Sequence, residues 1–331
     1  MDKTDKKVDI SVIVCVYAGG EFFKKNIESV SRLKIPDNTR VEFLFIDNNS
    51  TDGNGEIIKE YARTYPDTFR YLLEPKPGKS YALNLGIKEA RGEILAFTDA
   101  DIILPEDWLL LVKEGFEKHN CAALGGRVLP VWEKKPSAWF TRETNNGKRC
   151  GMFGLFDGEK AGYYPPGKGP DFPSGGNSAV KREIFLKYGG FRTELGPKPG
   201  LHIGGEDDEF FCRVHLAGEK IFYHPPMTVY HQISQNRLTK RYLLQNGFFC
   251  HLDSLYIASL YPGTEKNKTR KELLALPETL GKFILSGFNA KLTTHSNFRY
   301  RVKLRNVFCG LSYRLLGFNR TIKLFKFVKY I

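Results

Sequence analysis

The sequence predicts an α/β fold, in which helices cover a largely parallel sheet. In the first third of the chain, short apolar runs rich in β-branched residues alternate with amphipathic stretches of helical period, which is the pattern of repeated strand–helix units. Polar clusters directly follow several of the apolar runs. Ligands bind at the carboxyl ends of strands in open α/β sheets, so these clusters are the first candidates for a functional site.

The first two strands are the clearest elements. Residues 9–17 (DISVIVCVY) form a continuous apolar run, as expected for a strand buried on both faces of a parallel sheet. Two glycines follow, and a stretch with helical spacing covers residues 21–33. Residues 41–46 (VEFLFI) form the second strand, which ends in the polar run DNNSTDG before an amphipathic helix through Tyr61. This spacing predicts parallel strands joined by right-handed crossovers.

The third unit contains a Gly-Lys-Ser string. Residues 69–73 form the strand, residues 77–80 (PGKS) the loop and residues 81–90 the helix. A P-loop requires G-x-x-x-x-G-K-S/T, and Leu73 stands where the first of those glycines is needed. The first strand is not followed by the dinucleotide pattern G-x-G-x-x-G either. We therefore exclude a P-loop, and a dinucleotide site is disfavoured.

Two aspartates, Asp99 and Asp101, stand at the end of the fourth strand, in GEILAFTDADIILPEDWL at 92–109. Pro105 and the acidic residues after it indicate that a helix begins just beyond them. One interpretation is a solvated turn with a helix cap, since aspartate is common in both. The other is a divalent cation held by carboxylate oxygens, with a diphosphate on its far side.

A second acidic cluster, GGEDDEFFCR at 204–213, places four carboxylates after two glycines. The first turn of a helix tolerates them, because its free amides and its dipole favour negative charge. Glu209 and Arg213 are spaced i, i+4, which is typical of a structural ion pair. The simplest interpretation is an acidic helix start with a salt bridge, while the glycines also permit the close approach of a substrate.

The positive charge is confined to the C-terminal region. The net charge is +13, and residues 1–239 hold 33 Lys+Arg and 33 Asp+Glu, whereas residues 240–331 hold 17 and 4. Apolar residues recur there at helical spacing, opposite lysines such as Lys323 and Lys326. Basic amphipathic helices suit an anionic membrane surface, although such helices also pack on a neighbouring domain with their lysines in water. Nucleic acid is disfavoured as a partner, because no nucleic-acid-binding motif accompanies the charge.

The composition is that of a soluble globular protein, with 41% hydrophobic and 26% charged residues. The six cysteines have neither CxxC nor metal-ligand spacing, as in reduced thiols of a cytosolic protein. The N-terminus lacks the pattern of a signal peptide. No stretch reaches the roughly 18 uninterrupted apolar residues of a membrane span. We therefore expect a cytoplasmic location, with peripheral contact at the inner face of the membrane through the basic region.

Four stretches in this order resemble glycosyltransferases of family 2, which have the GT-A fold. The stretches are IDNNSTD at 46–52, FTDAD at 97–101, GGNSAVKR at 175–182 and GGEDDEFFCR at 204–213. The resemblance covers about residues 8–235. It implies a nucleotide-sugar-binding, Rossmann-like α/β fold with a mixed central sheet. It divides the chain into a catalytic domain at 1–239 and a mainly helical basic extension at 240–331, on the membrane or acceptor side.

The resemblance implies roles for particular residues. Asp47 reads the nucleotide base, Asp99 contacts the ribose or the metal shell, and Asp101 binds a divalent cation, Mn²⁺ or Mg²⁺. Asp207 is the general base, and His231 is a further metal ligand unless it is an ordinary histidine at a strand end. The other implied positions are Val16, Tyr17, Lys79, Asn84 and Ala100 for the donor, and Gly175, Gly176, Asn177, Glu206 and Asp208 on the acceptor side.

The implied activity is an inverting sugar transfer from a nucleoside diphosphate donor, expected to be a UDP-sugar. The acceptor is a hydroxyl of a glycan or lipid-linked glycan in cell-surface polysaccharide assembly. The first strand ends in Tyr17-Ala18 where the family usually has Tyr-Asn, which puts one polar contact to the nucleotide in doubt. The Q-x-x-R-W motif of processive synthases is absent, since every tryptophan precedes residue 140. One sugar per encounter is therefore expected.

Two other functions stay open at this point. A sugar nucleotidyltransferase shares the layered sheet and the acidic metal site, but it usually has a basic glycine-rich loop after its first strand, and AGGE at 18–21 lacks the basic residues. A catalytically silent glycan-binding scaffold is the other alternative, and the presence of Asp101 and Asp207 argues against it.

Overall fold

The computed structural model describes residues 7–143, 149–158, 160–165, 172–261 and 295–328. Its strands are β1 (Ile10–Val16), β2 (Val41–Asp47), β3 (Phe69–Leu73), β4 (Ile94–Asp99), β5 (Ile102–Ile103), β6 (Ala123–Trp132), β7 (Arg149–Cys150), β8 (Leu155–Phe156), β9 (Gly162–Tyr163), β10 (Asn177–Lys181) and β11 (Ile221–Ile233). Its helices are α1 (Gly20–Ser31), α2 (Asn54–Thr64), α3 (Lys79–Glu89), α4 (Trp108–Lys118), α5 (Ala138–Glu143), α6 (Arg182–Tyr188), α7 (Glu206–Leu216), α8 (Lys240–Leu260) and α11 (His295–Val328), with 3₁₀ turns η2 (Gly151–Phe153) and η3 (Gln235–Arg237).

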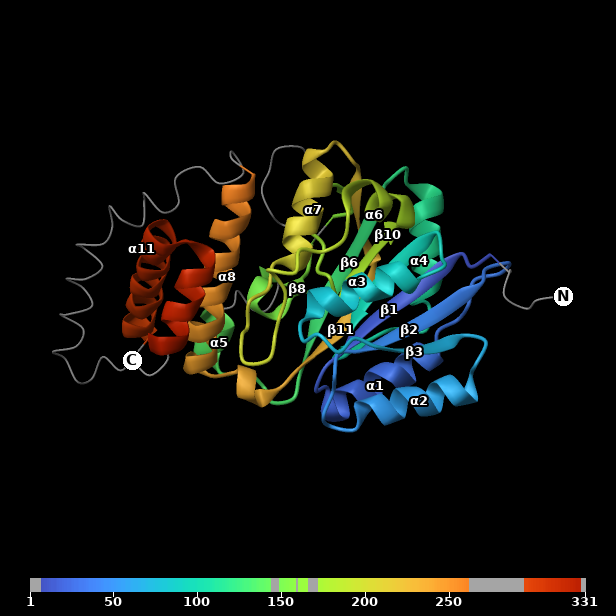
Figure 1. Ribbon diagram of the computed structural model, residues 1–331, viewed down its shortest axis with the longest axis horizontal. Coiled ribbons are helices and arrows are strands. Elements are labelled where there is room, and N and C mark those ends of the chain that lie inside the picture. The colour runs from blue at the N-terminus through green and yellow to red at the C-terminus, as the bar shows by residue number, and fades with distance from the viewer. Residues whose placement is uncertain (1–6, 144–148, 159, 166–171, 262–294, 329–331) are drawn as a thin grey trace.

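The main strands form one sheet in the order β3-β2-β1-β4-β10-β6-β11-β5 (Figure 1). The neighbours β3, β2, β1 and β4 are all parallel, as the alternation of strands and helices predicts. β10 runs antiparallel to β4 and to β6. This reversal makes the sheet mixed, in agreement with the sheet expected for the catalytic part.

Helices cover both faces of the sheet. Alternate side chains of a strand point to opposite faces, so Val12 and Val14 of β1 belong to one apolar core and Ile13 belongs to the other. Side chains of α1, α2 and α4 complete the first core, and side chains of α3, α6 and α7 contribute to the second. Because both faces are covered, the carboxyl ends of the parallel strands are the open edge at which a site can form.

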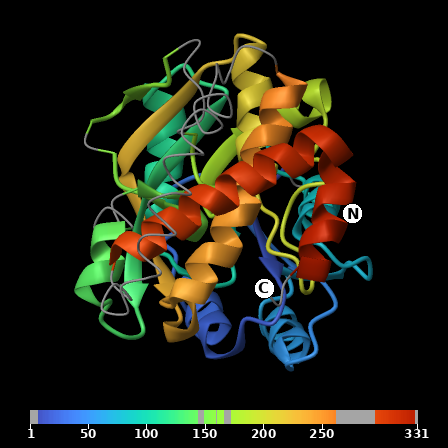
Figure 2. The same ribbon diagram turned by 90° about the vertical axis from the view of Figure 1, so that its left-hand side faces the viewer.

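The described part of the C-terminal region is helical, as the sequence predicts. α8 and α11 pack together at one end of the molecule, and α11 crosses over α8 (Figure 2). Phe248 and Leu252 of α8 are fully buried in the second core, beside side chains of α6 and α7. Gly317 interrupts α11 with a φ of 74°, a left-handed conformation that glycine adopts without steric cost.

One side of α11 exposes apolar side chains. The helical spacing placed Val307, Phe308, Leu311 and Leu315 on one face, but Val307 is buried and the other three are exposed, Leu315 by 80%. The other apolar residues at this helical spacing come before residue 306 or after residue 322, and their side chains are outside the described part of the structure. None of the helices in the described part of the chain combines the length and the apolar character needed to cross a bilayer.

Candidate active site

The carboxyl ends of β1 and β4 open onto a cavity of about 820 Å³, which we call the strand-end cavity. Its other walls are formed by the start of α7, the end of β11, one side of α8 and residues of the segments 150–156, 172–174 and 197–202. The residues predicted from the sequence that line it are Val16, Tyr17, Lys79, Asp99, Ala100, Asp101, Glu206, Asp207, Asp208 and His231. The fold therefore brings both acidic clusters of the sequence to one place.

Lys79, the first residue of α3, is a buried cation between two carboxylates. Its Nζ lies 2.7 Å from Asp99 Oδ1 and 3.3 Å from Glu206 Oε1. Burial disfavours its charged form, but Asp99, Glu206 and Asp207 outweigh burial and hold the pKa of Lys79 well above its usual 10.5. Burial raises the pKa of the Glu206 carboxyl to about 7 in spite of the nearby lysine. A fixed positive charge therefore stands in the cavity wall.

Asn48, directly after β2, holds the loop that carries Lys79. Its Oδ1 accepts a hydrogen bond of 2.7 Å from Gly78 N, and its Nδ2 donates to the carbonyls of Glu74 and Lys76 at 3.0 and 2.8 Å. Gly78 has a φ of 138°, which is open to glycine and strained for other residues. The polar run after the second strand thus orients the lysine.

Asp101 and His231 form a second polar pair in the cavity. Nε2 of His231 lies 2.9 Å from Asp101 Oδ2, and its Nδ1 lies 2.6 Å from the carbonyl oxygen of Phe153. Since a carbonyl only accepts, Nδ1 carries the hydrogen and the ring is held with Nε2 facing Asp101. Arg237 Nη1 is 3.6 Å from the same carboxylate oxygen. Burial of Asp101 favours its neutral form, but His231, Arg237 and Lys79 outweigh burial and hold the pKa of Asp101 well below its usual value.

The chain supplies part of a metal-ligand set at this pair. Asp99, the third predicted ligand, is engaged by Lys79. Within the described ranges, no group of three or more His, Cys, Asp or Glu side chains is arranged to hold a metal ion. A carboxylate oxygen and an imidazole nitrogen 2.9 Å apart suit a divalent cation whose other positions are filled by phosphate oxygens and water. The residues therefore fit a cation that binds together with a diphosphate.

Asp207 lies in the first turn of α7, where both of its carboxylate oxygens are oriented by backbone amides. Oδ2 accepts a hydrogen bond of 2.6 Å from Gly175 N, and Oδ1 accepts one of 2.9 Å from Asp208 N. A Cβ at position 175 would lie only 3.0 Å from Oδ2, so this approach depends on glycine. Each oxygen keeps a further lone pair, and Asp207 can therefore accept a proton from a hydroxyl in the cavity.

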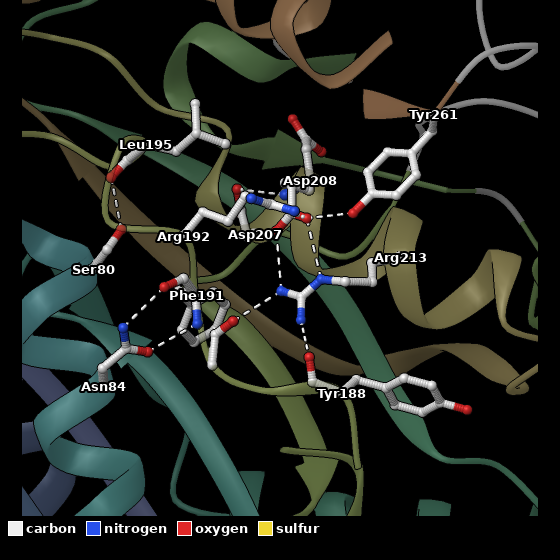
Figure 3. A network of polar contacts seen from close by, with 12 residues as sticks. Ser80, Asn84, Tyr188, Phe191, Arg192, Leu195, Asp207, Asp208, Arg213 and Tyr261 are labelled. Atoms are coloured by element: carbon white, nitrogen blue, oxygen red, sulfur yellow. Dashed lines mark hydrogen bonds and ion pairs between the residues drawn. The ribbon is translucent and has the colours of Figure 1, made fainter. Parts of the chain in front are cut away.

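Glu209 fixes the helix that carries Asp207. Its Oε1 accepts hydrogen bonds from Arg192 Nε at 2.9 Å and from the Tyr261 hydroxyl at 2.5 Å. Its Oε2 accepts one of 3.0 Å from Arg213 Nη2, which is the i, i+4 pair predicted from the sequence. Figure 3 shows Arg192, Arg213 and Tyr261 pointing toward one another. Because the Glu209 carboxylate is fully buried, these partners are what makes its charge tolerable.

The structure places Asn84 and Asn177 outside the strand-end cavity. The Asn84 amide forms hydrogen bonds of 2.9 and 2.8 Å with the backbone oxygen and nitrogen of Phe191 (Figure 3). The fully buried Asn177 donates to backbone carbonyls of β6 and β11, and its Oδ1 accepts a hydrogen bond from Trp108 Nε1. Both amides join segments far apart in the sequence, which differs from the predicted donor and acceptor roles.

Asp47 and the two predicted glycines stand beside the cavity without lining it. Asp47 Oδ1 accepts a hydrogen bond from Ser50 N at 2.8 Å, and its Oδ2 accepts one from the Tyr71 hydroxyl at 3.1 Å. Gly175 and Gly176 lie behind the carboxylates of the site, where a Cβ on either would come within 3.0 Å of a carboxylate oxygen. Gly176 leaves space for Asp99, and Gly175 both leaves space for Asp207 and donates a hydrogen bond to it.

Several polar residues of the cavity do not follow from the sequence motifs. They are Arg237, Asn246 and Asp253. The last two belong to α8, where they are seven residues apart on one side of the helix. The signal that indicates them is the pair of polar residues at helical spacing inside the largely apolar stretch LLQNGFFCHLDSLY.

Comparison with known proteins agrees with this geometry. The model of glycosyl transferase family 2 matches residues 11–189. The glucosyl-dolichyl phosphate glucuronosyltransferase of Haloferax volcanii is 24% identical over 274 residues, which are 80% of this chain and 83% of that protein.

Solved structures establish the fold. The mannosyltransferase PcManGT from Pyrobaculum calidifontis, in complex with GDP-Man and Mn²⁺, is similar with a TM-score of 0.53 at 18% identity over 93% of this chain and 87% of that one. Residues 1–349 of S. aureus TarS, in complex with UDP-GlcNAc, give a TM-score of 0.51 at 14% identity over 93% and 92% of the two chains. The match spans 43% of the longer TarS chain. The GT-A fold expected from the sequence is confirmed.

Proposed function

Because the chain belongs to glycosyl transferase family 2, we propose that it transfers a sugar from a nucleoside diphosphate donor to a hydroxyl of a glycan or lipid-linked glycan. The observation that carries the proposal is one cavity that brings together Lys79, the Asp101–His231 pair and Asp207. A UDP-sugar is the first donor to test, and cell-surface polysaccharide assembly is the proposed setting. In support, one relative is named for a glucosyl-dolichyl phosphate acceptor, and the two structural neighbours hold UDP-GlcNAc or GDP-Man.

A divalent cation, Mn²⁺ or Mg²⁺, is part of the proposal. Asp101 and His231 would hold it, and the neighbour from P. calidifontis contains Mn²⁺. When bound, the cation supplies Lewis-acid stabilisation of the leaving diphosphate. Lys79 adds a fixed positive charge, and salt screens it little because the side chain is only 20% exposed.

Asp207 is the proposed general base. An acceptor hydroxyl has a pKa far above neutrality, so its attack requires a positioned proton acceptor. The hydroxyl oxygen forms the new bond to the anomeric carbon while the bond from that carbon to the diphosphate breaks. The proton goes to Asp207, and the nucleoside diphosphate leaves with the electron pair. A single displacement from the face opposite the leaving group inverts the configuration at the anomeric carbon.

Thermal unfolding with nucleotides tests the donor site without knowledge of the acceptor. A ligand that binds only the folded state raises stability by mass action, by about 2.7 kcal/mol at a hundred times its Kd. We expect UDP or a UDP-sugar with Mn²⁺ or Mg²⁺ to raise the unfolding temperature, and GDP serves as the comparison. Asp101→Ala should lose the metal-dependent part of the shift, whereas Asp67→Ala, at an exposed position outside the cavity, should keep it. If no nucleotide shifts the wild-type protein, the proposal is wrong.

We also propose that α11 brings the enzyme to the inner face of the cytoplasmic membrane, near a lipid-linked acceptor. Phe308, Leu311 and Leu315 are exposed on this helix, and Arg314 is exposed next to Leu315. Such a surface suits an anionic bilayer, because apolar side chains become buried in the membrane interface and basic side chains are attracted to the anionic head groups.

Sedimentation with anionic liposomes at low salt tests the membrane contact. Leu315→Glu should reduce the sedimented fraction, because it places a negative charge on the proposed contact surface. Leu186→Glu is the matched control, since Leu186 of α6 is 79% exposed and Leu315 is 80% exposed. Equal sedimentation of both variants would show that α11 is not the contact.

A further inference from the structure

One side of α8 lines the strand-end cavity from end to end. Tyr242, Asn246, Cys250 and Asp253 all line the cavity, and their spacing of three or four residues places them on one face of the helix. This stripe begins on the cation side, where the Tyr242 hydroxyl accepts a hydrogen bond of 2.8 Å from Arg237. It ends at Asp253, next to the glycines that precede α7.

Asp253 is bonded to the loop that positions the proposed base. Gly204 N donates a hydrogen bond of 3.0 Å to Asp253 Oδ2, and a Cβ on Gly205 would lie 3.0 Å from the Asp253 Cβ. Burial raises the pKa of Asp253 well above its usual value, and the acidic residues of α7 raise it further against the effect of the Gly204 bond. Asp253 therefore holds a proton more tightly than an exposed aspartate does, and its side chain packs against the start of α7.

Two oxygens on this face of α8 have no hydrogen-bond partner among the described residues. They are Asp253 Oδ1 and Asn246 Oδ1, on side chains that are 5% and 7% exposed. Buried polar atoms in folded proteins are nearly always hydrogen-bonded, because an unpaired one is costly. Both side chains belong to residues that line the strand-end cavity, so a ligand bound there is a candidate partner for these oxygens.

The charge around these oxygens selects the ligand. Glu206, Asp207 and Asp208 line the cavity close enough to Asp253 for their charges to raise its pKa. Lys79 lies between Asp99 and Glu206, and Arg237 lies beside Asp101 on the cation side. An anionic group is disfavoured beside the carboxylates. A hydroxyl group both donates and accepts, so it satisfies either a carboxyl or an amide oxygen.

We propose that Asp253 and Asn246 form a subsite for the acceptor sugar, in which they bind hydroxyl groups of an uncharged ring and hold that ring against Asp207. This inference rests on the proposed function and deepens it, since it names the contacts and the chemical class of the acceptor.

Saturation-transfer NMR tests the subsite with the full-length protein and defined probes. The probes are the methyl glycosides of glucose, galactose and mannose, each with and without UDP or GDP and Mn²⁺. Asp253→Ala and Asn246→Ala each remove one of the unpaired oxygens. Asp253→Asn keeps the shape of the side chain and can still accept the bond from Gly204, so it controls for movement of the loop. Ser259→Ala, on α8 outside the cavity, is the matched control.

At least one glycoside should bind the wild-type protein, Ser259→Ala and Asp253→Asn. Binding to each alanine variant should be about tenfold weaker or more, as the loss of a hydrogen bond to a buried group predicts. The subsite is overturned if no glycoside binds the wild-type protein, or if both alanine variants bind as tightly as the wild type. Nucleotide binding in the same samples separates the two proposals, because its absence from the wild-type protein contradicts the proposed function itself.

Discussion

Replacing Glu206 with glutamine should change how the stability of the protein depends on pH. The Glu206 side chain is 4% exposed, and burial raises the pKa of its carboxyl from the usual 4.5 to about 7, with Lys79 opposing the rise and Asp207 adding to it. A pKa difference of this size between the folded and unfolded states corresponds to about 3 kcal/mol of unfolding free energy.

The direction in which stability changes with pH follows from how many protons each state binds. Folded Glu206 holds its proton more tightly than the unfolded chain does, so between pH 4.5 and about 7 the folded state binds more protons. Stability from this group is therefore complete below pH 4.5, falls as the pH rises through about 7 and is constant above it. Glutamine does not titrate. The stability of Glu206→Gln relative to that of the wild type should therefore rise by about 3 kcal/mol as the pH increases from 4.5 to about 7.

Urea denaturation of both proteins at several values between about pH 4 and about pH 8 measures this difference. The subtraction removes the titration of histidines, which both proteins share. Glu56→Gln is the control: Glu56 is an exposed carboxylate whose pKa is lowered by a hydrogen bond from Lys59, so its replacement should give a difference that does not vary in the window. If the difference between the wild type and Glu206→Gln is the same at both ends of the range, the reasoning about the buried carboxyl is wrong.

Two further substitutions test the proposed base and the helix that carries it. Asp207→Asn should lower turnover by about 10²–10⁴-fold while the thermal shift with nucleotide and metal stays as in the wild type; wild-type turnover would remove Asp207 from the role of base. Glu209→Gln should lower the urea-derived unfolding free energy by about 3 kcal/mol, because Arg213 and Arg192 lose their buried partner, and an unchanged midpoint would contradict this account of α7.

The strand ends could be predicted from local sequence. A continuous apolar run that stops at a polar cluster predicts a strand end, and Asp99 and Asp101 were found in this way. The acidic cluster that contains Asp207 is recognisable from two glycines followed by four carboxylates at a helix start. That these residues meet is a property of topology, because parallel strands bring their carboxyl ends to one edge. The family resemblance supplied the roles that the residue types alone left open.

The direction of individual side chains could not be predicted. Asn84 pairs with backbone 107 residues away, and Asn177 pairs with Trp108 69 residues away. Arg237 reaches the cavity from a segment whose local pattern indicates only a turn. In each case the decisive contact is long-range, so no spacing rule within one segment contains it.

The basic C-terminal region takes part in the fold of the catalytic part through α8. Phe248, Phe249, Leu252 and Ile257 are buried in the core that also contains Phe210 of α7. Burial of each such side chain contributes about 1.5–3 kcal/mol. Their sum, roughly 6–12 kcal/mol, is comparable with the entire stability of a typical domain.

A chain that ends at residue 239 should therefore lose cooperative thermal unfolding and the nucleotide-dependent shift, although it keeps every family motif. Removal of α8 also takes away Asp253 and its bond to Gly204, so the loop before Asp207 loses a support. Circular dichroism during heating measures the first property and the shift with UDP and Mn²⁺ measures the second. A truncated chain that melts cooperatively at the wild-type midpoint would show that residues 1–239 fold alone and that α8 is an appendage. If the truncation unfolds, its failure to sediment with liposomes carries no information, and for this reason the membrane contact must be tested with single exposed residues such as Leu315.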